Sequence, residues 1–330
     1  MSQLVNQKQP AEDPPARHLS VAEDASTWDM WAEHWTRHLA ATNRSETTVE
    51  TYLKSLRGFV RWAVAQRILG PEEVDHASVE TFLAAQLARP KSRGTGTLSP
   101  STVHRDYRHL KVFFAWFADT EDLANPMAKV GAPKTEEKVI DSFSDDELRA
   151  LLGTCKGKGF AKRRDTAILR MLLDTGIRRS ELAGIHLADV DQSNQIVRVQ
   201  GKGRRERLVP YGSKTAEAID SYIRVRARHR DRDRTDALWL ADSPHRGQLG
   251  YEGIHQVLER RGKEAGVDNV HSHRFRHTAA SAFLEAGGTE GQAMLIFGWR
   301  TRSMLDRYGA DQASRRAIEA AHRLTPGDRI

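Results

Sequence analysis

The chain has 330 residues, with 51 Lys and Arg against 44 Asp and Glu, a formal net charge of +7 and one cysteine. This length is sufficient for two domains of ordinary size, and the single Cys155 excludes both a disulfide framework and a Cys-based zinc site. The sequence contains no apolar run near the roughly 18 residues that span a membrane and no signal-peptide core at its start, so we expect a cytoplasmic protein without a membrane partner.

The positive charge is concentrated in the second part of the chain. Residues 1–134 carry 16 basic and 16 acidic residues, so the whole excess lies in residues 135–330. A basic domain favours a polyanionic partner such as nucleic acid. The densest run, Arg224 to Arg234, also contains Asp231 and Asp233. It is compatible with a DNA contact and equally with a solvated helix end.

The first part of the chain has the pattern of a helical bundle. Residues 1–25 are polar and contain proline, which predicts a disordered N-terminus. Four amphipathic helices are expected within residues 26–124, at about 27–41, from a Ser45 cap onward, at about 77–88, and from a Ser99 cap with Pro100 in first position. These helices predict a compact helical bundle over residues 26–124, followed by a linker over residues 125–142.

The second domain is expected over residues 143–330 and combines helices with a small sheet. It opens with Ser144-Asp-Asp-Glu147, which has the pattern of a capping box. Two β-branched runs flank Gly201-Lys202-Gly203 and predict a hairpin. Helices are expected at about 162–174, 179–185, 213–229, 251–265, 273–286, 289–297, 302–308 and 312–323. The predicted fold class is mainly α with a small antiparallel β-sheet in the second domain.

The run His273-Arg274-Phe275-Arg276-His277 is the strongest candidate for a functional site. Helical spacing brings His273, Arg276 and His277 onto one face, and such a face requires an anionic partner when it is packed. Phosphate fits, because the arginine fork matches its oxygens. Arg274 is expected to face a DNA backbone or solvent. We predict no metal site, because no acidic or Cys ligand lies near the two histidines in sequence and the arginines would repel a cation.

Four further residues are ambiguous when each is considered alone. Arg178 follows Gly176 at the first turn of a predicted helix, where free N–H groups favour an anion, although an ordinary helix corner gives the same pattern. Lys202 lies at a hairpin tip whose glycines allow close approach of a ligand, but it could equally face solvent. Trp299 and Tyr308 could both be packing residues.

The order of these motifs resembles the tyrosine recombinase, or phage integrase, family. The chain shows, in sequence, Thr-Gly-x-Arg178-x-Ser-Glu181-Leu, Gly-Lys202-Gly-x-x-x-Arg, His273-x-x-Arg276-His277, Gly-Trp299 and Tyr308. The resemblance spans about residues 145–310 through these motifs. Residues 27–125 are similar, less specifically, to the family's helical core-binding domain.

The resemblance implies a reaction at a DNA phosphodiester. Tyr308 would be the nucleophile and would form a 3′-phosphotyrosyl bond. Arg178 and Arg276 would clamp the phosphate as it gains charge. Lys202 would protonate the leaving 5′-hydroxyl, and His273 would assist proton transfer at the tyrosine.

The resemblance also implies supporting roles and one departure. Glu181 would orient the basic groups, and His277 would pack behind them. Trp299 stands where many relatives have His, and its indole can donate one hydrogen bond but cannot shuttle a proton. The covalent intermediate conserves bond energy, and the sequence contains neither a phosphate-binding loop nor an acidic metal triad, so we expect no cofactor and no metal.

The expected partner is a specific site on double-stranded DNA, bound by a homotetramer on two sites, with an accessory DNA-bending or directionality factor left open. The amphipathic segment 312–324 could dock on its own domain or on a neighbour. Two segments depart from the usual Xer pattern, namely Phe-Gly-Trp299 and Met304-Leu-Asp-Arg-Tyr308. This departure favours a role in the integration or excision of a mobile element. The alternatives are a Xer-type chromosome or plasmid dimer resolvase, a topoisomerase-like enzyme, and a non-catalytic DNA-binding relative.

Overall fold

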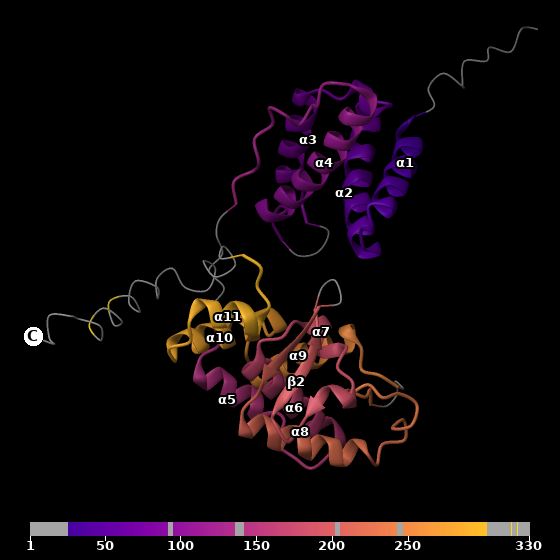
Figure 1. Cartoon of the computed structure of the whole chain (residues 1–330). Helices are drawn as coiled ribbons and strands as arrows, with labels where there is room; N and C mark the ends of the chain where they lie inside the picture. The colour runs from indigo at the N-terminus through magenta and orange to yellow at the C-terminus, as the bar shows by residue number, and fades with distance from the viewer. Residues whose placement is uncertain are drawn as a thin grey trace, which may run out of the picture. The chain divides into compact units, whose positions relative to one another are not determined.

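The computed structural model divides the chain into two compact units, residues 1–137 and 138–330 (Figure 1). It describes residues 26–91, 95–135, 142–201, 205–242 and 247–301, together with residues 318 and 322. The expectations for residues 1–25, for the helix at 302–308 and for most of the segment 312–324 therefore lie outside the described residues, as do Lys202 and Tyr308. The described residues contain no helix with the length and hydrophobicity of a membrane span.

The first unit is a helical bundle around an aromatic core. Its elements are α1 (Trp28–Ala41), α2 (Glu46–Ala65), the 3-10 helix η1 (Pro71–Glu73), α3 (His76–Ala88) and α4 (Pro100–Glu121). The predicted caps are confirmed, because Ser45 accepts from the backbone N–H of Thr48 and Ser99 from that of Thr102. The apolar stripes of these helices bury aromatic rings that are at most 1% exposed, namely Trp28, Trp35, Phe59, Phe82, Phe113 and Phe114.

The segment that follows α4 packs against this bundle. Met127 and Val130 are buried in the same core. The Tyr107 hydroxyl donates to the Val130 carbonyl at 2.9 Å, and His104 Nδ1 lies 3.0 Å from the Pro133 carbonyl oxygen. The first part of the predicted linker is therefore attached to the helical unit through irregular backbone, which produces no periodic pattern in the sequence.

The second unit combines seven helices with one small sheet among its described residues. The helices are α5 (Asp145–Gly153), α6 (Phe160–Thr175), α7 (Arg179–Ala183), α8 (Ser213–Arg226), α9 (Tyr251–Ala265), α10 (Ser272–Glu285) and α11 (Glu290–Phe297). The strands β1 (Val190–Asp191), β2 (Ile196–Gln200) and β3 (Glu206–Pro210) pair antiparallel in that order. The predicted fold class is confirmed. The short β1 and the 3-10 helix η2 (Leu187–Asp189) were not predicted, because two or three residues carry no period.

Helix α6 forms the centre of this unit, between α8 and α10 (Figure 1). Its side chains Ala167, Ile168, Leu169, Met171 and Leu172 are at most 1% exposed. The helix ends at Gly176, which adopts the left-handed conformation at φ +54°. Because α6 packs against helices on both sides, its end holds Arg178, two residues after Gly176, at a defined point.

Replacement of Gly176 by Ala is expected to destabilise the second unit by about 2 kcal/mol or more. A Cβ at this position would lie 2.6 Å from Phe297 Cε1, in addition to the strain of a positive φ. Gly266→Ala is the matched control, since Gly266 also ends a helix at φ +66° but has no atom within 4 Å of the added Cβ. Equal shifts of the thermal unfolding midpoint in the two variants would show that the contact with Phe297 is unimportant.

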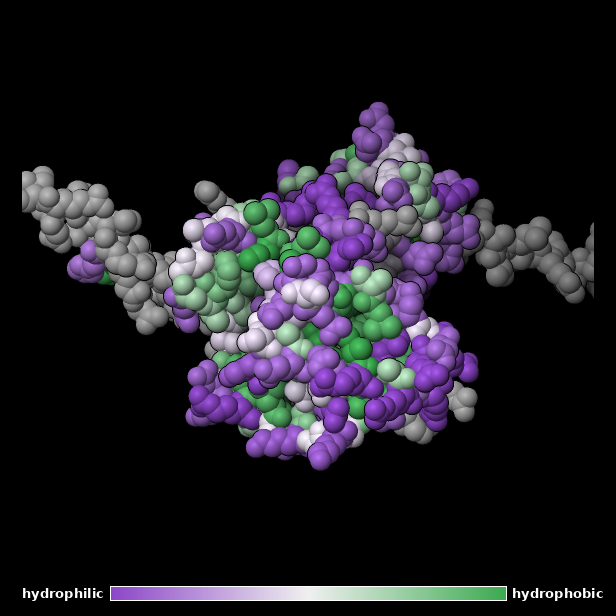
Figure 2. Space-filling view, turned by 60° about the horizontal axis from the view of Figure 1, so that its bottom comes forward, coloured by the Kyte–Doolittle hydropathy of each residue, from purple (hydrophilic) through white to green (hydrophobic). Residues whose placement is uncertain are grey.

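Polar side chains cover most of the face in Figure 2, with apolar patches between them. The largest exposed apolar side chains of the second unit include Leu295, at 76%, and Leu208, at 63%. Leu208 lies on β3 between Arg207 and Val209, of which Val209 is fully buried. The alternation along β3 therefore turns Leu208 outward and the side chains on either side of it inward.

Candidate active site

Three arginines from distant parts of the sequence converge on the C-terminal end of α11. Arg207 Nε donates to the Ile296 carbonyl at 2.9 Å, Arg276 Nη2 donates to the Phe297 carbonyl, and Arg178 Nη2 lies 3.4 Å from the Gly298 carbonyl. The last carbonyls of a helix have no partner within the helix and form the negative end of its dipole. Three consecutive carbonyls of one helix end therefore hold three cationic side chains in place.

Arg276 is the most enclosed of the three arginines, with 3% of its surface exposed. Its Nη1 donates to the Gly176 carbonyl at the end of α6, at 2.8 Å. Its guanidinium carbon lies 5.6 Å from the centre of the Phe297 ring and 5.5 Å from that of Trp299. Two helix ends and two aromatic rings thus fix a permanently charged group at one position.

Glu181 links two of these arginines from a buried position, where only 2% of its side chain is exposed. It accepts from the Arg178 backbone N–H at 2.8 Å and from Arg178 Nη1 at 2.9 Å. Arg207 binds it with two parallel bonds of 2.9 and 2.8 Å. Burial alone would raise the pKa of Glu181, but the hydrogen bonds from Arg207 and from the Arg178 backbone outweigh it and lower the pKa. The carboxylate therefore stays ionised and orients both arginines.

Arg178 is the member of this group most open to a ligand, since 33% of its side chain is exposed compared with 15% for Arg207. It immediately precedes α7, whose first free N–H groups lie beside it. The predicted site residues Arg178, Glu181, Arg276 and Trp299 are thus brought together at the ends of α6 and α11. The positions of Lys202 and Tyr308 relative to them lie outside the described part of the chain.

His273 and His277 have different surroundings, although the sequence places them on one helix face. His273 lies in the first turn of α10 and is exposed, whereas His277 is 5% exposed. The protein around His273 lowers its pKa by desolvation, and the charges of Arg276, Arg178 and Arg179 lower it further. The imidazole of His273 is therefore neutral near pH 7 and able to accept a proton.

Trp299 follows the left-handed Gly298 and is 4% exposed. Its ring stacks on Phe297, with centroids 5.0 Å apart and an angle of 28° between the planes. With Arg276 over the same ring, Trp299 forms an apolar wall beside the arginine group. A packing contribution of this kind agrees with the chemistry of an indole, which does not exchange protons.

Arg274 is largely covered by protein, with 12% of its side chain exposed, whereas the sequence led us to expect it to face a DNA backbone or solvent. Its Nη2 donates to both carboxylate oxygens of Glu147, at 2.8 and 2.9 Å, and its guanidinium lies 4.0 Å from the centre of the Phe143 ring. Glu147 belongs to the predicted capping box with Ser144, which is confirmed at the start of α5. Arg274 therefore fastens α10 to α5, because the capping carboxylate offers a fixed anion.

Arg207 is the site residue to which the sequence analysis assigned no role. It closes the motif Gly-Lys202-Gly-x-x-x-Arg, but the motif does not show which way the side chain points. The available signal was the strand alternation, since Arg207 lies two residues before the buried Val209 and so shares its face. A charged residue on the inner face of a strand requires a buried anion, and Glu181 is that anion.

Two members of the densest charge run, residues 224–234, are buried and have structural partners, whereas most of its other charged side chains are exposed. Arg226 is 3% exposed and donates to the carbonyls of Thr235, Ala237 and Leu238. Asp231 is 1% exposed and accepts from the Gly247 backbone N–H at 3.2 Å. These contacts hold the segment after α8 against the end of that helix. Because the Arg226 side chain is buried in them, it is not a DNA contact.

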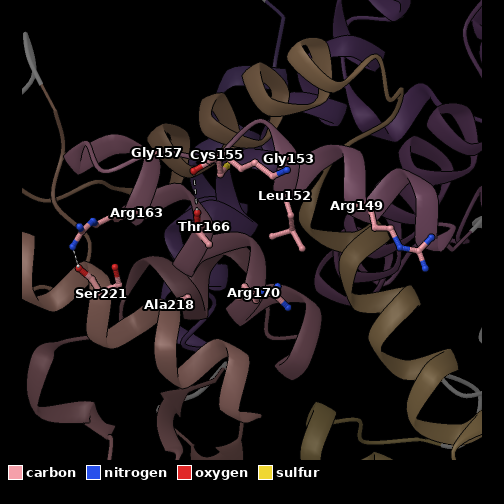
Figure 3. Close-up of a pocket in the computed structure, with 11 residues that line it drawn as sticks. Arg149, Leu152, Gly153, Cys155, Gly157, Arg163, Thr166, Arg170, Ala218 and Ser221 are labelled. Carbon is pink, nitrogen blue, oxygen red and sulfur yellow. Dashed lines mark hydrogen bonds between the residues drawn. The ribbon is translucent and has the colours of Figure 1, made fainter.

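A cavity elsewhere in the second unit contains none of the predicted site residues. It lies between α5, α6 and α8 and is lined by Arg163, Thr166, Arg170 and Ser221, among others (Figure 3). Arg163 Nη1 donates to the Ser221 carbonyl at 3.3 Å across it. Within the described residues, no group of three or more His, Cys, Asp and Glu could hold a metal ion.

Comparison with known proteins gives consistent results for both units. The Phage integrase family model matches residues 141–315, and the model named Phage integrase, N-terminal SAM-like domain matches residues 31–122. Tyrosine recombinase XerC of Staphylococcus haemolyticus is 32% identical over 284 residues, which are 85% of this chain and 92% of that protein.

Solved structures show the same fold at low sequence identity. The Tn1549 transposon integrase, in complex with transposon right end DNA, gives a TM-score of 0.69 at 20% identity, over 91% of this chain and 99% of that one. The XerH site-specific recombinase, bound to palindromic difH substrate, gives a TM-score of 0.66 at 16% identity, over 85% and 81%.

Proposed function

Because the chain belongs to the phage integrase family of tyrosine recombinases, we propose that it is a site-specific DNA recombinase with Tyr308 as its nucleophile. The observation that carries this proposal is the convergence of Arg178 and Arg276 on the end of α11, with the ionised Glu181 orienting Arg178. Two fixed guanidinium groups of this kind suit an anion that gains charge during reaction.

The chemistry proposed for these residues is a reversible transfer of a phosphoryl group. Tyr308 Oη attacks the scissile phosphorus while the bond from phosphorus to the 5′-oxygen breaks. The phenol proton passes to the neutral imidazole of His273, and Lys202 supplies a proton to the departing 5′-oxygen. Attack by the 5′-hydroxyl of another strand then reverses these steps and releases Tyr308, so the exchange requires no net consumption of energy.

The proposed substrate is a pair of duplex DNA sites held by four copies of the chain. Exchange between two duplexes cleaves four strands, and each copy contributes one nucleophile. The solved relatives XerH and the Tn1549 integrase are bound to DNA, which supports a DNA complex for this chain. Phosphate contacts would supply most of the affinity and make it sensitive to salt.

The similarity to XerC over 92% of its length favours a Xer-type role, the resolution of chromosome or plasmid dimers. The second candidate is integration or excision of a mobile element, which the Gly-Trp299 motif and the residues before Tyr308 favour. Deletion of the gene distinguishes the two roles. A resolvase deletion leaves undivided chromosome or plasmid dimers, whereas an integrase deletion removes the circular junction formed when the flanking DNA excises, detected by amplification across that junction.

The proposed activity is tested by covalent capture on DNA that carries the recombination site, which is sought in the flanks of the gene for an integrase and in the chromosome or plasmid for a resolvase. A nick near the cleavage point lets the short 5′-hydroxyl fragment diffuse away, so that the covalent intermediate accumulates. We expect adducts that resist SDS with the wild-type chain and none with Tyr308→Phe. Sequence-specific binding without adduct would instead support a non-catalytic relative. Relaxation of any supercoiled plasmid without a defined site would support a topoisomerase-like enzyme.

The pH dependence of cleavage should report the lowered pKa of His273. The neutral imidazole accepts the phenol proton, so the rate should rise as the pH rises through the His273 pKa, which lies below its ordinary value of 6.5. His273→Gln should cleave more slowly than the wild-type chain, and its rate should lack this rise with pH at the acidic end. His186→Gln is the control, because His186 is a surface residue paired with Asp236. A rise that survives in His273→Gln would assign the titration to another group.

A further inference from the structure

We propose that Arg207 is a positioning residue of this active site, acting through Glu181 on Arg178 and through the end of α11 on Arg276. This proposal rests on the recombinase function proposed above. It adds Arg207, a side chain that the proposed phosphoryl transfer does not use directly. Arg207 touches no reacting group in that scheme. From β3, it joins three features of the site, which are Glu181 of α7, the end of α11 and Gly201 at the start of the hairpin turn after β2.

The first feature is the paired contact with Glu181. Arg207 occupies both carboxylate oxygens, at 2.9 and 2.8 Å, and Arg178 Nη1 shares one of them at 2.9 Å. Without Arg207, both oxygens would be available to the Arg178 guanidinium, which would be drawn into a two-pronged pair with Glu181. Arg207 therefore limits the Arg178 guanidinium to one bond with the Glu181 carboxylate. The remaining N–H groups of that guanidinium stay oriented toward a ligand.

The second feature is the contact with the end of α11. Arg207 Nε donates to the Ile296 carbonyl, one residue before the carbonyl that binds Arg276. Its guanidinium also lies flat against Gly298, where an added Cβ would be 3.2 to 3.3 Å from three of its atoms. A glycine allows this close approach at φ +62° without strain, whereas an added Cβ would require the guanidinium to shift. The strand β3 is thus joined directly to the turn that precedes Trp299.

The third feature is the start of the hairpin turn. A Cβ on Gly201 would lie 3.5 Å from Glu181 Oε1 and 3.7 Å from Arg207 Nη1, in ordinary contact distance. The Glu181–Arg207 pair thus lies against the residue that precedes Lys202 in the sequence. A change at Arg207 is therefore expected to affect the geometry of the phosphate site rather than one bond alone, and a displacement of about 1 Å in such a site can cost about 100-fold in rate.

The test compares two substrates that differ at the scissile phosphate. One is the ordinary phosphodiester, and the other carries a methylphosphonate, in which a methyl group replaces one non-bridging oxygen and removes the negative charge. We expect Arg207→Gln to slow single-turnover cleavage of the phosphodiester by about 100-fold and that of the methylphosphonate by less than about 10-fold, each relative to wild type. The smaller loss follows because a neutral phosphorus centre depends less on a charged clamp.

Two variants control for charge and for folding. Arg224→Gln removes one positive charge from a surface arginine of the same unit that pairs with Asp220, and should leave both rates unchanged. Arg207→Lys retains a cation beside Glu181 and should show an intermediate loss on the phosphodiester. If Arg207→Gln does not fold, as judged by its thermal unfolding, the two substrates are compared in Arg207→Lys instead.

Equal losses on the two substrates, or no loss on the phosphodiester, would overturn the positioning role. A failure of the proposed function is separate and visible, because the wild-type chain would then form no adduct with either substrate. Glu181→Gln provides a final check. If Arg207 acts through Glu181, adding Arg207→Gln to Glu181→Gln should slow cleavage by much less than Arg207→Gln slows it in the wild-type chain. Equal effects in the two backgrounds would contradict the link.

Discussion

Arg276→Ala is expected to reduce the single-turnover rate of DNA cleavage by about 1000-fold. The side chain is held by the carbonyls of Gly176 and Phe297 and by two aromatic rings, so its charge requires no reorganisation when the phosphate becomes more negative. Arg276→Lys should recover little of the loss, because an ammonium group cannot bridge both carbonyls and present a fork to the phosphate. The rate is measured as covalent adduct formed against time on a nicked substrate.

The neighbouring Arg274 provides a matched control on the same helix. Arg274 binds Glu147 and stacks on Phe143, away from the arginine group at the end of α11. Arg274→Ala should lower the thermal unfolding midpoint, because the capping carboxylate loses its partner, but should change the cleavage rate by only a few-fold. A rate loss in Arg274→Ala as large as that in Arg276→Ala would contradict the division of this run into one catalytic and one structural arginine.

Asp165→Asn is expected to destabilise the second unit by about 3 to 5 kcal/mol. Asp165 is fully buried and pairs with Arg164 at 2.9 Å, Arg260 at 2.9 Å and Arg261 at 2.6 Å. Arg164 and Arg261 are themselves only 3% exposed, so loss of the carboxylate leaves two buried cations without their shared counter-ion. The free energy of unfolding is measured by urea denaturation, following the transition of the second unit.

Asp146→Asn is the surface control for this prediction. Asp146 is 93% exposed and pairs with Arg149, so its replacement should leave the transition unchanged within error. An equally stable Asp165→Asn variant would mean that the surrounding arginines find other partners when the charge is removed.

The fold was predictable where local chemistry decides it. Ser45, Ser99 and Ser144 each accept a backbone N–H at the start of the helix that the sequence predicts. The hairpin of β2 and β3 likewise follows from β-branched runs around a glycine turn. Periodicity could not reveal the packing of Met127 and Val130, because irregular backbone buries side chains through tertiary contacts alone.

Several residues of the candidate site were expected from the sequence, but their arrangement in space was not. The motif order made Arg178, Glu181 and Arg276 candidates, but no pattern in the sequence indicates that Arg207, Arg276 and Arg178 share the last carbonyls of one helix. Such a grouping depends on three long-range contacts, which no local pattern encodes. Arg274 shows the same limit, because its partner Glu147 lies 127 residues earlier in the chain.

Identification of the residue that carries the DNA tests the proposed role of Tyr308 directly. The trapped adduct is digested with nuclease and trypsin, and the modified peptide is sequenced by mass spectrometry. We expect a phosphotyrosine within residues 308–315, at Tyr308, joined to the 3′ side of the break and leaving a free 5′-hydroxyl on the other strand end. A linkage through any other residue, or through a 5′-phosphate, would contradict that role.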